Sequence, residues 1–359
     1  MIEFSLGMDD PTRPLIIINA AAARTRRAWP IIRDALARGR IRFDTCEPAQ
    51  AGGTREQTRA GLCEGYRIIA VVGGDGTLSE AAAGFFESCE QTENDATPRR
   101  VGEVEGGSKN GGHSGVLSDI TDGAALAILP AGTGDDFARG LAGAREPLEN
   151  WVERLIKYCR RPGADLLEGS PNLRVVDLLH AEIGDEEPRR FICLNAATLG
   201  IGAEVAERVA AQNGVVRKLP GEARFAAAAI GALAVWRERR VRVRVDGAAI
   251  ECRTNMLAVV NGTYAGGGMN FAPAARPDDG VLDVMMACGV SRLGIMRELT
   301  RIHRGGHLAN PRVRVLRGTR VRIEALDTTD ALGVEADGDV RGTTPVEFRV
   351  MPRALRVIF

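Results

Sequence analysis

The stretch IIAVVGGDGTLSEAAA, residues 68–83, decides the fold of this chain. Its apolar first part predicts a buried strand, its centre is a glycine-rich turn, and its last part is typical of a helix. In this order, backbone N–H groups at the helix N-terminus point toward one place, where a phosphate binds while the Asp75 carboxylate stays free for Mg²⁺. The stretch therefore indicates nucleotide binding, although a GGDG turn also occurs in proteins without a ligand.

A second glycine turn follows another predicted strand. Residues 125–129, ALAIL, are apolar, and PAGTGDDFAR follows at residues 130–139. Parallel strands end at the same edge of a sheet, which is the edge where doubly wound folds bind ligands. We therefore expect the two turns to form one crevice.

The chain of 359 residues is long enough for two domains. The first, residues 1–145, alternates strand and helix patterns, which predicts a doubly wound, mainly parallel sheet with helices on both faces. The pattern gives strands at residues 15–18, 41–43, 68–72 and 125–129, and helices at residues 28–36 and 54–61. Residues 88–122 interrupt it with glycines and polar residues, which predicts a mobile insertion because little carbon is available for burial.

The second domain, residues 146–359, has a different pattern. After an amphipathic helix at residues 151–158, apolar residues recur with period two, which predicts an antiparallel β-sandwich. The strands expected there are residues 173–176, 191–194, 241–245, 257–260, 313–315, 321–323 and 346–350. One helical segment, residues 203–239, interrupts them.

Composition excludes several classes of protein. The formal net charge of +0 gives the molecule no electrostatic basis for binding nucleic acid. The seven cysteines include an odd one and form no C-x-x-C pair, which predicts reduced thiols in a cytoplasmic protein. The longest apolar helical stretch, residues 225–236, is far shorter than the ~20 residues that span a bilayer.

Four motifs resemble those of a known family. They are GGDGT at residues 73–77, LPAGTGDDFAR at residues 129–139, VVNGTYAGGGMNFAPAARPDDGVLDV at residues 259–284 and EADGD at residues 335–339. In this order they resemble the diacylglycerol kinase catalytic-domain family, with its soluble bacterial members and its sphingosine kinase relatives. NAD kinases share the GGDG turn, but their second nucleotide-site signature is not found in this chain.

The resemblance implies roles for individual residues. The residues that it implies for ATP binding are Asn19, Gly73, Gly74, Asp75, Gly76, Thr77, Gly132, Thr133, Gly134 and Asp136. It also implies Mg²⁺ near Asp75 and a loop ordered by Asp278 and Asp279, in some members around a structural Mg²⁺. Asp337 falls where the family has its general base, and Asp339 in the same turn is the second carboxylate implied for catalysis. From the residues alone, a hairpin turn is the favoured interpretation of Asp-Gly at this place, and the resemblance moves the preference to the catalytic one.

The chain departs from the family pattern at three positions. Asp135 replaces the usual asparagine, so an extra negative charge beside the phosphates calls for an additional cation. Asp339 replaces a glutamate that is one methylene longer. Ala20 follows Asn19 where proline is usual, which weakens the assignment of Asn19.

The resemblance implies an ATP-dependent lipid kinase that phosphorylates a lipid alcohol, with diacylglycerol as the first choice of acceptor. Such chemistry requires Mg²⁺ and oriented N–H groups around the γ-phosphate and a carboxylate that accepts the hydroxyl proton. Three alternatives stay open. They are a kinase for sphingoid bases or phosphatidylglycerol, an NAD kinase, and a nucleotide-binding regulator without turnover.

A lipid acceptor implies a cytoplasmic protein in peripheral contact with a membrane, and a homodimer stays open. Arginines alternate along the predicted strands at residues 242, 244, 312, 314, 320 and 322. If they share one surface, they would attract anionic headgroups by about 1 kcal/mol per charge. Otherwise they mark solvated strand faces.

Overall fold

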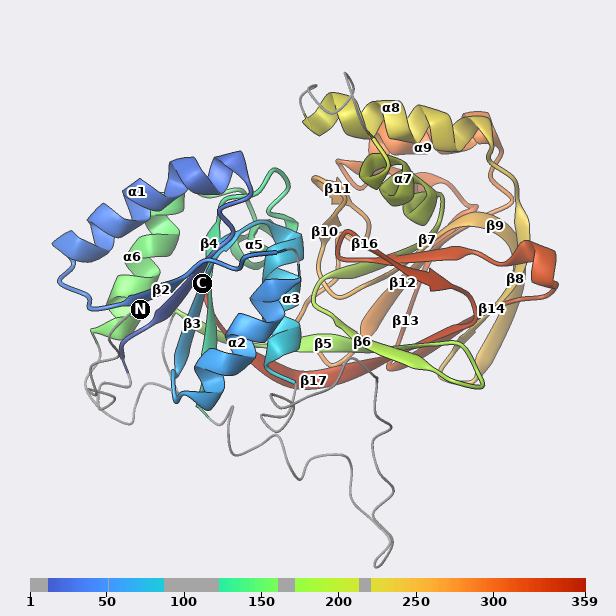
Figure 1. Cartoon of the computed structure of the whole chain (residues 1–359). Helices are drawn as coiled ribbons and strands as arrows, with labels where there is room; N and C mark the ends of the chain where they lie inside the picture. Colours follow the sequence, from blue (N-terminus) through green and yellow to red (C-terminus); the bar gives the residue numbers. More distant parts are fainter. Residues whose placement is uncertain (1–11, 51, 87–122, 161–171, 213–220) are drawn as a thin grey trace, which may run out of the picture.

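The computed structural model describes residues 12–50, 52–86, 123–160, 172–212 and 221–359 (Figure 1). The insertion predicted at residues 88–122 lies outside these ranges. Within them the chain forms an α/β part with parallel strands and an antiparallel β-sandwich-like part, as the sequence predicts.

The first part is built on a parallel sheet with the strand order β4-β3-β1-β2. Its strands are β1 (Leu15–Ile18), β2 (Asp44–Cys46), β3 (Ile68–Gly73) and β4 (Ala125–Pro130). Its helices are α1 (Ala23–Arg38), α2 (Gly53–Cys63), α3 (Asp75–Gly84), α5 (Asp136–Ala142) and α6 (Leu148–Cys159). Every residue of β3 is buried, because helices cover both faces of the sheet.

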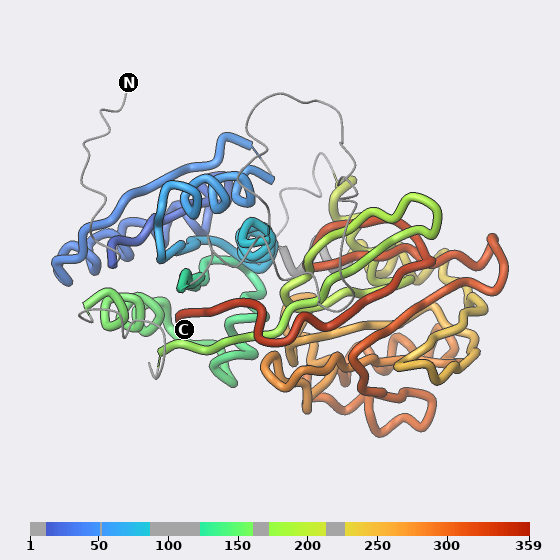
Figure 2. The backbone as a smooth tube through the Cα atoms, turned by 90° about the horizontal axis from the view of Figure 1, so that it is seen from below, coloured from blue at the N-terminus to red at the C-terminus, as the bar shows by residue number. Residues whose placement is uncertain are grey.

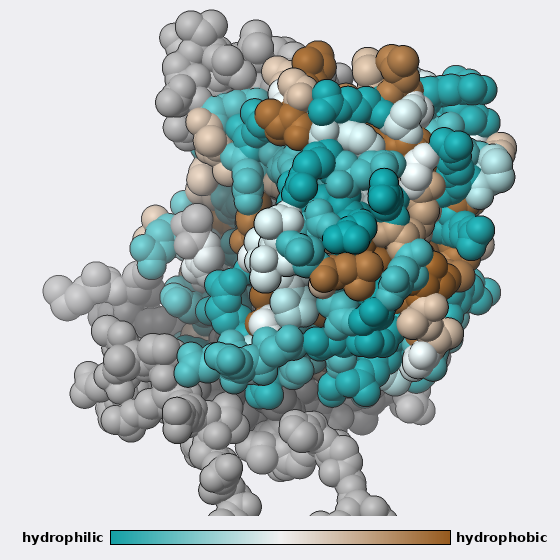
Figure 3. All heavy atoms as spheres, turned by 90° about the vertical axis from the view of Figure 1, so that its right-hand side faces the viewer, coloured by the Kyte–Doolittle hydropathy of each residue, from teal (hydrophilic) through white to brown (hydrophobic). Residues whose placement is uncertain are grey.

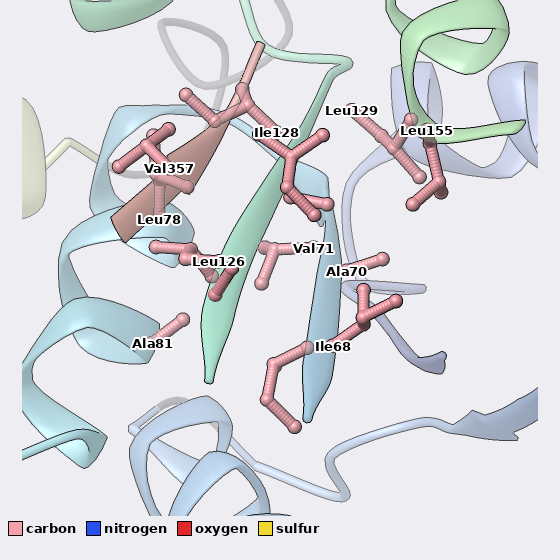
Figure 4. Close-up of a cluster of buried hydrophobic side chains, with 14 of the residues drawn as sticks. Ile68, Ala70, Val71, Leu78, Ala81, Leu126, Ile128, Leu129, Leu155 and Val357 are labelled. Carbon is pink, nitrogen blue, oxygen red and sulfur yellow. The ribbon is translucent and has the colours of Figure 1, made fainter. Parts of the chain in front are cut away.

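Figure 4 shows this layering around β3 and β4. Leu78 and Ala81 of α3 lie on one side of the strands, and Leu155 of α6 lies on the other. α2 packs against α3, and α6 packs against α1 and β4. The sheet is therefore doubly wound, and the carboxyl ends of β3 and β4 are left open between the helix layers.

The second part is an antiparallel array in the order β16-β15-β7-β9-β8-β14-β17, with β12 and β13 beside β9 and with β5 and β6 beside β17. These strands are β5 (Leu173–Ile183), β6 (Arg189–Cys193), β7 (Ala196–Gly200), β8 (Arg239–Val245), β9 (Ala248–Val260), β12 (Leu282–Cys288), β13 (Val313–Gly318), β14 (Arg320–Ala325), β15 (Gly333–Ala336), β16 (Asp339–Thr343) and β17 (Val346–Ile358). Alternate residues of these strands, such as Val243, Leu257 and Phe348, form one buried core.

The outer face of this array is covered by helices and one short hairpin. They are α7 (Ile201–Ala210), α8 (Gly221–Ala234), α9 (Arg292–Ile302), and the strands β10 (Tyr264–Ala265) and β11 (Met269–Asn270). Short 3-10 helices lie at Gly306–Ala309 and Thr328–Asp330. Side chains such as Met285 and Ile295 form the core beneath this cover.

The last strand connects the two parts. β17 begins in the antiparallel array, but its residues Val357 and Ile358 pair in parallel with β4. Figure 2 shows the C-terminal end of the chain running from the array into the first part. The end of the chain therefore completes the first sheet, and the division predicted between residues 145 and 146 stays a prediction.

Several local predictions were wrong. The strand expected at residues 41–43 lies at Asp44–Cys46, because β2 is short and poorly buried. The single helical segment expected at residues 203–239 forms two helices, α7 and α8. β7 and β12 were missed, since alternation is hidden where both faces of a strand are covered. β15 and β16 were missed because they are only four and five residues long.

Two further expectations concern thiols and membrane spans. Cys63 is disulfide-bonded, so the expectation of reduced thiols is wrong at this position. Of the helices in the described ranges, none has the length and hydropathy to cross a bilayer.

Candidate active site

The first glycine turn joins β3 to α3 at the carboxyl edge of the parallel sheet. Gly74 is extended, and the helix begins at Asp75. Gly73 has no room for a side chain, because a Cβ there would lie 2.7 Å from Thr77 Cβ. Asn19, at the end of β1, donates from Nδ2 to the Thr77 hydroxyl at 2.8 Å. The N-terminus of α3 therefore directs backbone N–H groups into this edge.

The second glycine turn lies directly against the first. A Cβ on Gly132 would lie only 2.5 Å from Gly74 Cα. Ala131 N donates to Gly73 O at 2.8 Å. Thr133 is exposed at the tip of the turn. The two turns thus form one continuous edge, as the order of the strands predicts.

Two carboxylates converge beside Gly134. A Cβ there would lie 3.1 Å from Asp75 Oδ2 and 3.2 Å from Asp136 Oδ2. Burial, and then the charge of Asp136, raises the pKa of Asp75 to about 7. Burial also raises the pKa of Asp136, whose Oδ1 has no hydrogen-bond partner among the described residues and lies 3.9 Å from Nη1 of Arg139. A bound cation would strongly stabilise the ionised forms of these two carboxylates, because it relieves their mutual repulsion in a poorly hydrated place.

Asp135 has a cation of its own. Its backbone is left-handed (φ 50), and its Oδ1 accepts a hydrogen bond from Gly132 N at 2.8 Å. Arg145 pairs with Asp135 Oδ2 at 3.3 Å. Arg24 donates to Gly132 O at 3.0 Å. Both arginines, with Trp151, line a cavity of about 250 Å³. Arg145 is therefore the additional cation that the aspartate at position 135 calls for.

The third motif is joined to the second through the β10–β11 hairpin. Asp136 Oδ2 accepts a hydrogen bond from Gly267 N at 2.6 Å, at the tip of the hairpin. Arg139 lies over the Tyr264 ring, 5.4 Å from its centroid. Gly268 has a positive φ, and a Cβ there would lie 2.2 Å from Arg139 Nη1. Asp136 therefore connects the glycine turn with a loop of the other domain.

Asp337 lies beside the nucleotide turn. Its Oδ2 accepts hydrogen bonds from Ser79 Oγ of α3 at 2.5 Å and from Leu194 N at 2.6 Å. Its Oδ1 accepts from Asn195 N and Ala196 N, both at 3.0 Å. A Cβ on Gly76 would lie 3.6 Å from Asp337 O, so the Asp-Gly turn touches the GGDG turn. The domains meet at this carboxylate.

The second carboxylate near Asp337 is Glu335, not Asp339. Asp339 begins β16, and its side chain points to solvent and pairs with Arg341 at 3.2 Å. Glu335 accepts hydrogen bonds from the Thr198 hydroxyl and from Gly338 N. Burial raises the pKa of Glu335 to about 7. Glu335 therefore fixes the turn in which Asp337 takes its positive φ of 49.

Asp278 and Asp279 lie in a loop before β12 and are occupied by arginines. Asp278 pairs with Arg276 at 3.5 Å, and Asp279 pairs with Arg317. The buried Asp177 holds the loop, since its Oδ2 accepts a hydrogen bond from Gly280 N at 2.6 Å. No cluster of three or more metal-ligating side chains occurs in the described part of the chain, at this loop or elsewhere. The structure does not bring these two residues together with Asp75.

Sequence reasoning missed Ser79, Glu335 and Arg145. A signal existed for the first two. Ser79 lies four residues after Asp75 in a helix, so the two share a face. Glu335 begins the turn motif EADGD that contains Asp337, two residues before it. Arg145 lies in a loop, and no periodic pattern connects it to Asp135.

Comparisons with known proteins agree with this geometry. Residues 13–164 match the family model described as the diacylglycerol kinase catalytic domain, and residues 195–359 match the YegS C-terminal NAD kinase beta sandwich-like domain. The chain therefore contains these two domains, and it is an ATP-dependent lipid kinase.

Individual relatives are similar over most of their length. The chain is 29% identical to "Probable lipid kinase YegS-like" of Pseudomonas aeruginosa, covering 85% of this chain and 81% of that protein. It is 28% identical to "Diacylglycerol kinase" of Mycobacterium tuberculosis, covering 65% and 68%. A solved structure of a Bacillus anthracis protein assigned as a diacylglycerol kinase superposes with a TM-score of 0.68 over 97% of both chains, at 19% identity.

Proposed function

We propose that this kinase transfers the γ-phosphoryl group of ATP to the hydroxyl of diacylglycerol, giving phosphatidic acid, with Asp337 as the general base. The observation that carries the proposal is the hydrogen bond between Asp337 of the second domain and Ser79 in the helix of the GGDG turn. This hydrogen bond joins the Asp337 carboxylate of the Asp-Gly turn to α3, the helix whose N-terminus is suited to bind phosphate. The names of the relatives support a lipid acceptor.

The hydrogen bonds of Asp337 suggest how the acceptor reaches it. Asp337 accepts hydrogen bonds from three fixed backbone N–H groups and from the Ser79 hydroxyl, and the buried Cys193 thiol also interacts with it. Of the four oxygen and nitrogen donors, the Ser79 hydroxyl is the one that can rotate away. The acceptor hydroxyl takes that site and passes its proton to Asp337 as its oxygen bonds the γ-phosphorus. The bond to the β-phosphate oxygen breaks, and ADP leaves with the electron pair.

The residues at the sheet edge fit a divalent cation. Asp75 and Asp136 are close, both have a raised pKa, and Asp136 Oδ1 lacks a hydrogen-bond partner among the described residues. These two side chains would hold Mg²⁺, with phosphate oxygens completing its ligands. When bound, Mg²⁺ neutralises charge on the transferring phosphate. Asp278 and Asp279 stay outside this proposal because arginines neutralise them.

The experiment is a transfer assay with labelled ATP and a panel of acceptors: diacylglycerol, a sphingoid base, phosphatidylglycerol and NAD. We expect label in phosphatidic acid, identified by chromatography, and a large loss in Asp337→Asn. Label in another lipid would support the kinase activity but identify a different acceptor. Transfer to NAD alone would identify an NAD kinase, and nucleotide binding without any transfer would identify a regulator. Undiminished turnover in Asp337→Asn would show that Asp337 is not the general base.

A further inference from the structure

The arginines of the sandwich strands do not form the basic surface that their alternation suggests. Arg242, Arg244, Arg320 and Arg322 each pair with a carboxylate at 2.9 Å or less; the partners are Glu251, Glu324, Glu347 and Asp185. Arg312 donates instead to Gly289 O. Attraction of these strand faces to anionic lipids is therefore largely cancelled.

A different surface is apolar and exposed. The large apolar side chains concerned lie on and just after α8 and on α9; they are Ile230 (67% exposed), Val235 (58%), Leu293 (79%) and Met296 (50%). The C-terminal end of α8 lies near the start of α9, because the Arg292 guanidinium donates to Trp236 O at 2.5 and 3.0 Å. In Figure 3, apolar groups alternate with hydrophilic ones at the top of the molecule, the height at which Figure 1 shows α8 and α9.

The charge of this surface has one sign on α9. The single acid of this helix is Glu298, which is buried and pairs with Arg301 at 3.2 Å. Arg297 and Arg304 are exposed, and neither has an acidic partner among the described residues. Exposed apolar side chains between unpaired arginines are typical of helices that lie on anionic membranes.

The same surface is connected to the candidate active site. α9 ends at His303, whose Nδ1 makes a hydrogen bond with Gly268 O at 3.1 Å. Gly268 belongs to the tip of the β10–β11 hairpin, which Asp136 and Arg139 hold against the second glycine turn. A bilayer in contact with α9 would therefore lie next to the loop that joins the two domains.

We propose that Ile230, Val235, Leu293 and Met296, together with Arg297 and Arg304, form a docking surface for an anionic bilayer. We name it the α8–α9 surface. The inference rests on the proposed function, because an acceptor such as diacylglycerol resides in a bilayer. Leu293 and Met296 insert among the acyl chains, and the arginines contact anionic headgroups.

Sedimentation of the full chain with vesicles tests the proposal. The vesicles are phosphatidylcholine with or without phosphatidylglycerol. We expect the wild type to bind the anionic vesicles more strongly. Leu293→Glu combined with Met296→Glu reduces binding at least about tenfold, since two exposed apolar contacts are lost. Arg297→Glu combined with Arg304→Glu reduces it at least about fivefold, and only on anionic vesicles.

A matched control is Ile31→Glu, which places the same charge at an exposed apolar position of α1. It leaves vesicle binding unchanged. A dispersed short-chain diacylglycerol separates docking from chemistry, because all variants should phosphorylate it like the wild type. Unchanged vesicle binding in the Leu293 and Met296 variant would overturn the docking surface and leave the kinase intact. Light scattering that showed this variant converting a dimer to a monomer would assign the surface to a second copy and also overturn it.

Discussion

The two regions that meet at the candidate site hold their carboxylates in opposite ways. At the sheet edge, Asp75 and Asp136 approach one another, and burial raises the pKa of both. At the Asp-Gly turn, Asp337 accepts four hydrogen bonds, three of them from backbone N–H groups. The first arrangement compensates the negative charge only in part, through backbone N–H donors to each carboxylate and through Arg139 at 3.9 Å from Asp136. The second surrounds a single carboxylate with donors.

This difference separates two tasks of phosphoryl transfer. A pair of partly compensated carboxylates is suited to a cation that arrives with the nucleotide, because binding relieves their repulsion. A carboxylate fixed by backbone donors is suited to proton transfer, because its position is set before the acceptor arrives. The comparison predicts that the two regions respond differently to substitution and to pH.

The largest effect is expected at the Asp-Gly turn. Asp337→Asn keeps the shape of the side chain but cannot accept the hydroxyl proton, so kcat should fall by about 10²- to 10⁴-fold, with nucleotide affinity nearly unchanged. Steady-state kinetics and nucleotide titration measure both quantities. The matched control is Asp339→Asn two residues away, where the side chain is exposed, and turnover should stay within about twofold. Equal losses in both variants would contradict the assignment of Asp337.

The next effect concerns the sheet edge and its pH dependence. In the proposed function, Mg²⁺–ATP binds the ionised form of Asp75, and burial raises the pKa of Asp75 to about 7 without nucleotide. The affinity for Mg²⁺–ATP should therefore rise as pH increases from 6 to 8. Asp75→Asn should bind about ten- to a hundredfold more weakly and lose this dependence. Calorimetry at several pH values checks both points, and an unaltered pH profile would remove Asp75 from the cation site.

The stability of the folded protein should change with pH in the opposite direction to its affinity for Mg²⁺–ATP. A carboxyl whose pKa is higher in the folded than in the unfolded protein binds more protons when folded, so stability falls as pH rises between the two values. Asp75 and Glu335 both have this property up to about pH 7. Without nucleotide, Tm of the wild type should therefore decline from pH 5 to pH 7, and Asp75→Asn should decline less. A parallel decline in the two proteins would show that Asp75 is ionised throughout.

Some parts of this site were predictable from the sequence because local patterns determine them, and others were not because they depend on contacts between distant residues. The two glycine turns were predictable because parallel strands must end at one edge, and Gly74 and Gly132 do touch there. The meeting of Asp337 with α3 was not predictable from patterns. It joins residues that lie 258 positions apart, and only the family resemblance connected them.

Among the strands, too, some were predictable from the sequence and others were not. Strand β3 was predictable because both of its faces are buried and its sequence is continuously apolar. β15 and β16 were not, since four- and five-residue strands around an Asp-Gly turn carry almost no periodic signal. The second carboxylate was misplaced for this reason. Without knowing where β16 begins, the direction of Asp339 cannot be derived.

A smaller effect is expected at Ser79, which connects the two regions. If the acceptor hydroxyl takes the site that Ser79 occupies on Asp337, removal of the hydroxyl should help the acceptor. Ser79→Ala should therefore raise kcat/KM for the lipid about two- to fivefold and leave nucleotide affinity unchanged. Kinetics with a short-chain acceptor measure this. A decrease in kcat would show instead that Ser79 positions the base or relays the proton.

The smallest effect is expected where the sheet edge already has its own cation. Asp135→Asn keeps an acceptor for Gly132 N and suits the left-handed backbone, and it loses an ion pair whose arginine side chain is half exposed. Denaturant unfolding of Asp135→Asn, Arg145→Gln and the double variant should give a coupling of at most about 1 kcal/mol. A much larger coupling would mean that Asp135 behaves like Asp337, as a carboxylate whose position depends on its partners. Only Asp75 and Asp136 would then differ from Asp337 in the way that this comparison describes.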